Sequence, residues 1–483
     1  MRLKQVLLPV IATFLVLAAP GLALTPDAPA AERDPFPKAV PDCFGINTHF
    51  WDFSAGGKRG TGATWSLEKW EAWWGKTNPL EEMARSGFTL HRFMVDWESM
   101  EETKGTYDWG LQDALMKESE RHGMRPVLFL AYGNPKYDKT SGPSPDNGVH
   151  AVLTDEGREG FARWAGAVAA RYKGKRCIYE VWNEPNIKPF WPTPDPEAYV
   201  ALVRAAAAAV RKADPKALIA GGALSPKDLG EEFDLPFLTR CLELGMLEHV
   251  DIVSWHPYNL DSPEVVRGQI EELKGLIRKH APKGKAVEPL CTEVGYSPPP
   301  ESADVLKGHG HYVPRMLLSN LSLGVPTVWY EAMPNYTGYS LTERPRSGTD
   351  GHYLFPTTIA WGQKPGAMAT RVLTDALRGF TFTRRLAVGE AKTDYVLEFV
   401  RDGRIALAAW TTDDAGREVT VPLPAGSGTL VSWAAVQGDE AVQKRLMGDD
   451  YRGVRSKVDW NDPGVKLKLS PWPQYLLVER GGR

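Results

Sequence analysis

The stretch IYEVWNEPN, residues 178–186, decides the fold prediction for this chain. An apolar run over 178–182 ends in the tetrapeptide Asn183-Glu184-Pro185-Asn186. A helix does not easily run through Pro185, and the residue before a proline is pushed towards extended geometry. We therefore expect a buried strand over 177–183 that ends with an amide and a carboxylate at its tip. The rest of the sequence has to explain what that carboxylate does.

Short apolar segments of this kind recur along the chain and alternate with helical patterns. Continuous apolar runs are typical of strands that are buried on both faces of a parallel sheet. The predicted strands are 44–48, 89–95, 126–131, 177–183, 218–222, 251–255, 289–293 and 327–330. The predicted helices between them include 154–173, 195–212, 308–323 and 365–377.

Eight strands that alternate with helices predict an α/β fold, a (β/α)8 TIM barrel, over residues 42–380. A doubly wound open sheet would show the same alternation. No glycine-rich phosphate loop follows the first strand, which argues against a dinucleotide-binding sheet. From 381 to 483 the pattern changes to strand-like segments, two of which flank a hairpin turn at Arg401-Asp402-Gly403. This part predicts a small C-terminal antiparallel β-sandwich domain.

The N-terminus has the features of a secretory signal peptide. Basic side chains at positions 2 and 4 precede an apolar run that ends at residue 24, and Gly21-Leu22-Ala23 offers a cleavage site of small residues. We predict a signal peptide over 1–23 and a linker rich in proline and alanine over 24–41. The protein would then be secreted, that is, periplasmic or extracellular. An uncleaved membrane anchor is the alternative, and no other stretch is apolar enough to cross a bilayer.

The composition is that of an ordinary soluble globular protein, with 43% hydrophobic and 24% charged residues. The net charge of −3 indicates no basic face, so we expect no nucleic-acid partner. We expect a monomer that binds neither a metal nor a cofactor. The cysteines Cys43, Cys177, Cys241 and Cys291 show no metal-binding spacing. We expect buried free thiols, although export would also permit disulfides.

Two glutamates are prominent among the predicted strand ends. In a barrel of this kind the C-terminal ends of the strands converge on one mouth, where active sites lie. Glu184 follows the fourth strand and Glu293 ends the seventh, so the two should face each other across the mouth. Paired carboxylates carry out glycoside hydrolysis, one as a proton donor and the other in its ionised form.

The residues around the two glutamates suggest how their roles divide. We expect Arg92 and the Tyr258 hydroxyl to hold Glu293 in its ionised form. Glu184 would then be the acid, and Asn183 beside it could hold a sugar hydroxyl. A single glutamate at a strand end is more often solvated or salt-bridged than catalytic. Two glutamates that face each other, surrounded by aromatic and titratable side chains, favour a catalytic role over a structural one.

Several motifs resemble those of the retaining glycosidases of clan GH-A. VWNEPN at 181–186 is similar to the clan's acid/base motif, and CTEVGYS at 291–297 resembles its nucleophile strand. The segment 93–109 is similar to the part after the clan's second strand, and WGQKPGAMA at 361–369 resembles the start of its eighth helix. With its C-terminal β domain, the chain most resembles family 39 and related bacterial glycosidases.

This resemblance implies a role for each residue that matches the clan's pattern. Glu184 would be the general acid/base, Glu293 the nucleophile, and Asn183 the partner of the sugar 2-hydroxyl. Arg92 and Tyr258 would lie near the nucleophile. The other substrate-binding candidates are Trp329 as a platform under the sugar, Trp191 as a leaving-group contact, and His49, Tyr132, Asn134, His256 and Glu331 as further sugar contacts. Glu331 departs from the clan's pattern and could instead be a salt-bridge partner.

These observations predict a secreted retaining O-glycoside hydrolase that acts by double displacement, with its two carboxylates about 5–5.5 Å apart. We expect it to act on a poly- or oligosaccharide carbohydrate partner, endo-acting and on β-linkages. An exo-acting β-glycosidase, similar to a β-xylosidase, is the alternative within the same class. A non-catalytic carbohydrate-binding protein on a glycosidase scaffold is the alternative from another class.

Overall fold

The computed structural model describes most of the 483-residue chain. The described residues are 36, 38–48, 79–144, 148–226, 234–258, 262–296, 305–330, 365–433 and 452–479, with side chains left out at 305–309 and 365. The predicted signal peptide over 1–23 lies outside them, and so does most of the predicted linker. Among the described helices, none is both long and apolar enough to cross a bilayer.

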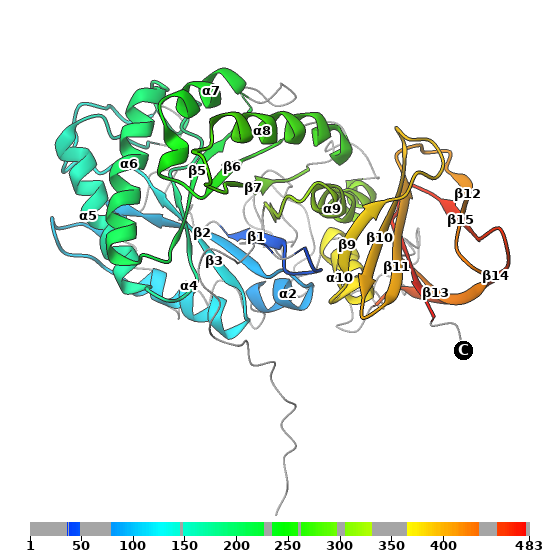
Figure 1. Cartoon of the computed structure of the whole chain (residues 1–483). Coiled ribbons are helices and arrows are strands. Elements are labelled where there is room, and N and C mark those ends of the chain that lie inside the picture. Colours follow the sequence, from blue (N-terminus) through cyan, green and yellow to red (C-terminus); the bar gives the residue numbers. More distant parts are fainter. Residues whose placement is uncertain are drawn as a thin grey trace, which may run out of the picture. The chain divides into compact units, whose positions relative to one another are not determined.

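Eight parallel strands close into a barrel in sequence order, with helices on its outside (Figure 1). The strands are β1 (Phe44–Thr48), β2 (Leu90–Asp96), β3 (Arg125–Ala131), β4 (Ile178–Val181), β5 (Leu218–Leu224), β6 (Ile252–Trp255), β7 (Glu288–Val294) and β8 (Thr327–Trp329). β1 pairs with both β2 and β8, which closes the sheet. The predicted TIM barrel is therefore confirmed, and the open-sheet alternative is excluded.

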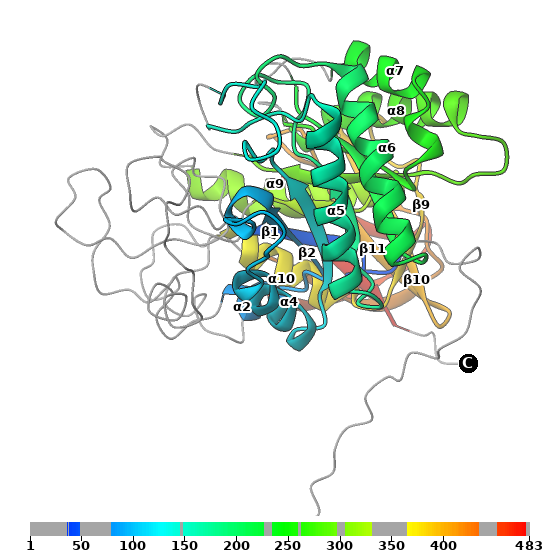
Figure 2. The same cartoon turned by 90° about the vertical axis from the view of Figure 1, so that its left-hand side faces the viewer.

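Helices connect the strands and shield their outer faces. They are α2 (Pro79–Arg85), α3 (Trp97–Met100), α4 (Gly110–Arg121), α5 (Asp155–Arg171), α6 (Pro196–Ala213), α7 (Leu235–Glu243), α8 (Arg267–His280), α9 (Val305–Ser322) and α10 (Pro365–Leu377), with 3-10 helices η2 (Met246–Glu248) and η3 (Pro263–Val266). Figure 2 shows α5 and α6 side by side against the strands. Both begin at side-chain caps, since Thr154 accepts from the N–H of Gly157 and Asp195 from that of Ala198.

An apolar layer fills the lower part of the barrel interior. One side chain from each of the strands β2 to β8 joins Phe36 in a buried cluster: Leu90, Val127, Ile178, Ala220, Ile252, Leu290 and Val328. Because side chains two residues apart on a strand point the same way, the next positions of β2 and β4 also face inwards. Those positions are Arg92 and Glu180, so a charged layer lies directly above the apolar one.

The C-terminal part forms antiparallel sheets, as predicted. A six-stranded sheet has the order β14-β13-β16-β11-β10-β9, and β12 pairs with β15 in a second sheet. The strands are β9 (Thr381–Arg385), β10 (Asp394–Arg401), β11 (Arg404–Thr411), β12 (Arg417–Val421), β13 (Gly426–Ser432), β14 (Val454–Trp460), β15 (Val465–Leu469) and β16 (Gln474–Val478). The hairpin at 401–404 is confirmed, with positive φ at both Asp402 and Gly403. A separate apolar cluster lies between the two sheets.

A buried polar cluster joins the barrel to the β domain. Glu264 in η3 accepts from the Arg315 guanidinium of α9 through two bonds of 2.8 and 2.7 Å. The indole N–H of Trp410, on β11, donates to the same carboxylate at 2.7 Å. The bidentate ion pair thus lies within the barrel, and the Trp410 indole connects it to the β domain.

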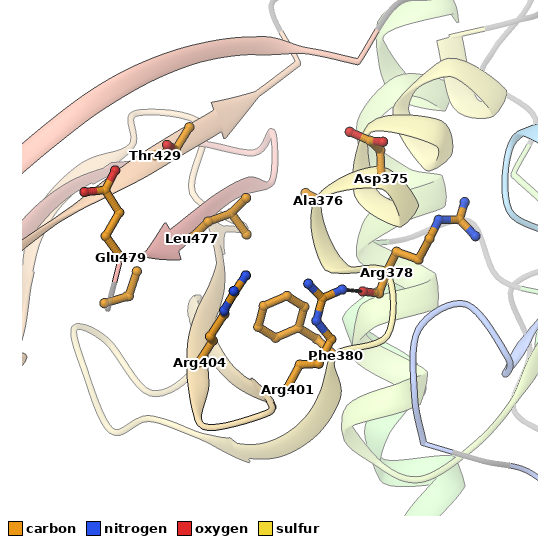
Figure 3. A pocket seen from close by; sticks show the side chains of 10 residues that line it. Asp375, Ala376, Arg378, Phe380, Arg401, Arg404, Thr429, Leu477 and Glu479 are labelled. Atoms are coloured by element: carbon orange, nitrogen blue, oxygen red, sulfur yellow. Dashed lines mark hydrogen bonds between the residues drawn. The ribbon is translucent and has the colours of Figure 1, made fainter. Parts of the chain in front are cut away.

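A pocket of about 410 Å³ lies where α10 meets the β domain (Figure 3). The guanidinium of Arg401 donates to the carbonyl of Arg378 at 2.5 Å and lies 4.9 Å from the centre of the Phe380 ring. Asp375, also in its lining, is paired with Arg455 at 2.6 Å. The strand-end residues of the barrel take no part in this pocket.

Two details differ from the prediction or settle an open point. β4 ends at Val181, two residues earlier than predicted, because Trp182 has φ of 74° and leaves the extended conformation. All four cysteines are buried and free, which confirms the prediction of free thiols. Burial raises the pKa of the Cys291 thiol well above its usual value.

Gly310 in α9 lies against two tryptophans of the β domain and provides a test of this packing. A Cβ at this position would lie 2.3 Å from Trp433 and 2.6 Å from Trp472. Gly310→Ala should therefore lower the free energy of unfolding by about 1–3 kcal/mol, measured by denaturant titration. The control is Gly275→Ala in α8, where the nearest atom is 3.9 Å away; it should be neutral or stabilising by up to about 1 kcal/mol. Equal stability of the two variants would contradict the packing described.

Candidate active site

Glu293 lies at the barrel mouth and accepts hydrogen bonds at both carboxylate oxygens. Arg92 donates to Oε2 at 2.7 Å, and Asn47 on β1 donates to the same oxygen at 3.3 Å. The Tyr258 hydroxyl donates to Oε1 at 2.8 Å. Three donors, one of them charged, favour the ionised form of a carboxylate. The geometry therefore fits the expectation that Glu293 is the ionised partner.

A shift in strand register brings Glu293 into this position. The pairing of β7 with β8 changes register between Cys291 and Val294. Strict alternation from the inward-facing Leu290 would direct Glu293 away from the interior. Irregularities of this kind re-aim side chains at the rims of barrels. At this strand end both Thr292 and Glu293 contact other residues of the mouth.

Glu184 at the tip of β4 has a different partner. His256, which follows β6, contacts the Glu184 carboxylate through Nδ1 at 2.8 Å. The other ring nitrogen of His256 lies 3.2 Å from the Thr292 hydroxyl. Glu184 is 6% exposed and Glu293 7%, so the two carboxylates are equally shielded from water. The partners described for them differ: a guanidinium contacts Glu293, and an imidazole contacts Glu184.

The backbone that carries Glu184 is strained. Trp182 and Glu184 have φ of 74° and 49°, the left-handed region that side chains other than glycine rarely adopt. The Glu184 N–H donates to the carbonyl of Ala223 on β5 at 2.9 Å, and Asn186 exchanges hydrogen bonds with the backbone of Ser225. Such conformations persist only where surrounding contacts enforce them, and they cluster at functional sites. The tip of β4 is therefore held in place by β5.

The two carboxylates are close enough for a retaining mechanism. One oxygen of Glu184, one oxygen of Glu293 and one ring nitrogen of His256 all lie within 4.8 Å of one another. Retaining glycosidases have carboxylates about 5–5.5 Å apart, while inverting ones need a gap of about 6.5–9.5 Å to admit a water. An oxygen–oxygen distance of at most 4.8 Å fits the closer spacing of the retaining class.

Among the described residues, Glu184, His256 and Glu293 are also a group whose ligand atoms lie close enough together to hold a metal ion. Carboxylates and an imidazole are suitable ligands for zinc and related metals. However, the Arg92 guanidinium lies 2.7 Å from the Glu293 carboxylate and would repel a cation bound there. The arrangement fits proton transfer and nucleophilic attack better than metal binding.

Arg92 connects the site to a residue that the sequence analysis missed. Its Nε donates to Glu180 and one terminal nitrogen to Asn183, each at 2.7 Å, and all three side chains are almost or fully buried. Burial alone would lower the pKa of Arg92, but the charges of Glu180 and Glu293 outweigh it and raise the pKa. The sequence did offer a signal for Glu180: it lies within the apolar run IYEVW, and a buried charge needs a charged or polar partner. Asn47 and Thr292 were also missed.

Among the remaining predicted residues, some contact the two carboxylates and others have different described neighbours. His256 and Tyr258 contact them directly. Tyr132 stacks on Phe190, and Asn134 accepts from the backbone N–H of Lys136, so both lie in the loop that follows β3. Trp329 is fully buried at the end of β8, near Tyr296. His49 and Glu331 lie outside the described residues.

Trp191 is placed differently from its predicted role. It is fully buried, and its ring contacts those of Trp182 and Tyr199. A leaving-group contact would need an exposed face, which this tryptophan lacks. In the structure it packs beneath the strained turn at Trp182 and supports it.

Comparison with known proteins connects this site to a family. A model described as glycosyl hydrolases family 39 matches residues 169–280, which include Glu184 and His256. A β-xylosidase of Geobacillus stearothermophilus is 35% identical over 86 residues, 18% of this chain and 16% of that protein. The match thus spans less than a fifth of the curated relative. The resemblance to family 39 is confirmed.

Solved structures share the fold over most of the chain. A family 39 glycoside hydrolase from the gut symbiont Bacteroides cellulosilyticus WH2 has a TM-score of 0.65 at 20% identity, covering 94% of this chain and 83% of that chain. A monomeric β-xylosidase from Caulobacter crescentus CB15 has a TM-score of 0.59 at 17% identity, covering 91% and 97%. These structures show that the chain shares their fold.

The hydroxyl of Tyr258 provides a test of the site's electrostatics. Burial and the neighbouring Glu293 raise the pKa of Tyr258 well above 10, so the hydroxyl stays protonated and donates throughout the working range. Tyr258→Phe should lower kcat/KM for a glycoside substrate about 10- to 100-fold, the cost of one hydrogen bond to a charged group. The alkaline limb of the pH profile below pH 10 should not move.

The matched control is Tyr137→Phe. This change also removes a tyrosine–glutamate hydrogen bond, from Tyr137 to Glu101 at 2.5 Å, but that carboxylate contacts neither Glu184 nor Glu293. It should lower the midpoint of thermal unfolding and leave kcat/KM within about twofold. A shifted alkaline limb in Tyr258→Phe would mean that the hydroxyl titrates in the working range.

Proposed function

We propose that this chain is a retaining glycoside hydrolase that cleaves β-linked O-glycosidic bonds by double displacement. The observation that carries the proposal is the pair Glu184 and Glu293, with oxygens within 4.8 Å of each other and with unlike partners. The Arg92 guanidinium contacts Glu293, and the His256 imidazole contacts Glu184. Unlike environments give paired carboxylates unlike roles.

In the first step Glu293 attacks the anomeric carbon. One of its carboxylate oxygens forms a covalent ester bond to that carbon as the bond to the leaving oxygen breaks. Glu184 donates its proton to that oxygen, and His256 fixes the orientation of the donating carboxyl group. Because the Asn183 side-chain oxygen accepts from Arg92, its amide N–H groups are left to donate to a sugar hydroxyl.

In the second step a water molecule releases the sugar. Glu184, now ionised, takes a proton from the water, which attacks the anomeric carbon from the side that the leaving group vacated. Glu293 leaves as a carboxylate and regains the donors Arg92, Asn47 and Tyr258. Two inversions at one carbon give a product with the configuration of the substrate.

The mode of attack on the substrate is part of this proposal. We propose internal cleavage of a poly- or oligosaccharide, because the chain has 17 tryptophans, and tryptophan rings form stacking platforms for the successive sugars of a chain. An exo-acting β-xylosidase is the second candidate, and the 35% identity to the Geobacillus β-xylosidase favours it. Xylan and short aryl β-xylosides therefore belong in the first substrate panel.

We also propose that the enzyme acts outside the cytoplasm as a monomer. The support for export is the predicted signal peptide over 1–23, and the buried free thiols would be compatible with an oxidising compartment. The Caulobacter β-xylosidase is described as monomeric, which supports the same state here.

Paired variants test the proposed roles. Glu293→Gln should lower kcat/KM at least about 1,000-fold on every substrate, because the covalent step is lost. Glu184→Gln should behave differently: with an activated aryl glycoside the covalent intermediate still forms, and added azide should restore turnover by replacing the activated water. The measurement is release of the aryl group with and without azide.

Three outcomes would count against the proposal. If Glu293→Gln keeps most of the activity, Glu293 is not the nucleophile. If added azide does not restore turnover of the activated aryl glycoside by Glu184→Gln, Glu184 is not the acid/base. Binding of glycans without turnover by the wild type would favour the non-catalytic alternative.

A further inference from the structure

Glu180 is a fully buried carboxylate with a single hydrogen-bond partner in the described part of the chain. It lies in the middle of β4, and its Oε2 accepts from Arg92 Nε at 2.7 Å. Its other oxygen, Oε1, has no hydrogen-bond partner among the described residues. A buried polar atom without a partner is uncommon in native proteins and calls for an explanation.

Stability does not explain this residue. Moving a carboxylate into the interior costs several kcal/mol, and one ion pair repays that cost only when the remaining oxygens are also hydrogen-bonded. Replacing such pairs by apolar side chains is often neutral or stabilising. The apolar layer directly below, which contains Ile178 and Val127, shows that the barrel fills its interior with such residues elsewhere. Glu180 must therefore contribute something other than packing.

Glu180 fixes the orientation of Arg92. The three nitrogens of this guanidinium each donate to a different acceptor: Nε to Glu180, Nη1 to Glu293 and Nη2 to Asn183, all at 2.7 Å. The guanidinium carbon also lies 4.1 Å from the centre of the Phe129 ring. Because the guanidinium is planar and rigid, holding its Nε edge directs the other two nitrogens at the mouth.

Glu180 also changes the charge that Glu293 presents to the substrate. Without it, Arg92 and Glu293 would form a neutral pair. With it, the buried set of Arg92, Glu180 and Glu293 carries a net charge of −1. The other titratable groups around this set are Glu184, Tyr258, His256, Tyr132, Cys291 and Tyr199. A negative net charge stabilises the positive centre that forms at the sugar in the transition state.

We propose that Glu180 is a positioning residue for the reaction: it holds Arg92 between Glu293 and Asn183 and neutralises its charge. This inference rests on the proposed glycosidase function. It predicts an effect on the transition state that exceeds the effect on substrate binding, because the positive charge on the sugar exists only there. Glu180 itself does not touch the substrate.

The test is Glu180→Gln, measured on an aryl β-glycoside that the wild type hydrolyses. Glutamine keeps the shape and can still accept from Arg92 through its carbonyl oxygen, so the change removes only the charge. Both kcat and kcat/KM should fall about 10- to 100-fold while KM stays within about twofold. Rates are expressed per competent site, titrated with a 2-deoxy-2-fluoro glycoside that traps the nucleophile. Glu180→Asp keeps the charge and should recover part of kcat.

The control is Glu264→Gln, at the buried bidentate ion pair with Arg315 described above. It should lower the midpoint of thermal unfolding and leave kcat and KM as in the wild type. If Glu180→Gln also loses stability with unchanged kcat and KM, the residue is only structural and the inference is wrong. If the wild type itself hydrolyses no glycoside, the proposed function fails and the inference fails with it.

Discussion

The contact between Arg92 and Glu293 is the interaction on which the candidate site depends. It joins β2 to β7 across the barrel at 2.7 Å and keeps the Glu293 charge inside a protected mouth. A carboxylate in such a place would be costly without a cation, and removal of Arg92 would leave two buried carboxylates unpaired. The same guanidinium contacts Asn183, so it links the nucleophile to the residue beside the proton donor.

The second constraint is the backbone at the tip of β4. Left-handed φ values at Trp182 and Glu184 cost free energy that ordinary strand ends do not require. Contacts from β5 and the buried ring of Trp191 hold this turn in place. A fixed turn sets the distance between Glu184 and Glu293. The fold thus provides rigidity at both carboxylates, through a turn on one side and a register shift on the other.

Much of the fold could be predicted because the strands are continuous apolar runs separated by helices with clear caps. β1 and α10 have the predicted bounds, and Glu184 and Glu293 face each other as expected. The early end of β4 could not be predicted, because nothing in the sequence before Pro185 indicates a left-handed Trp182. Likewise, alternation places Glu180 inside the barrel but does not identify Arg92 as its partner. The burial of Trp191 against Trp182 and Tyr199 could not be predicted either, because an aromatic near a strand end serves equally well as packing.

The stereochemistry of the first product tests the central claim most directly. The wild type is incubated with a β-glycoside, and the anomeric proton of the released sugar is followed by NMR from the first minutes. Double displacement at Glu293 predicts that the β-anomer appears first and then equilibrates with the α-anomer. Initial release of the α-anomer would show a single inversion and contradict the assignment of Glu293 as the nucleophile.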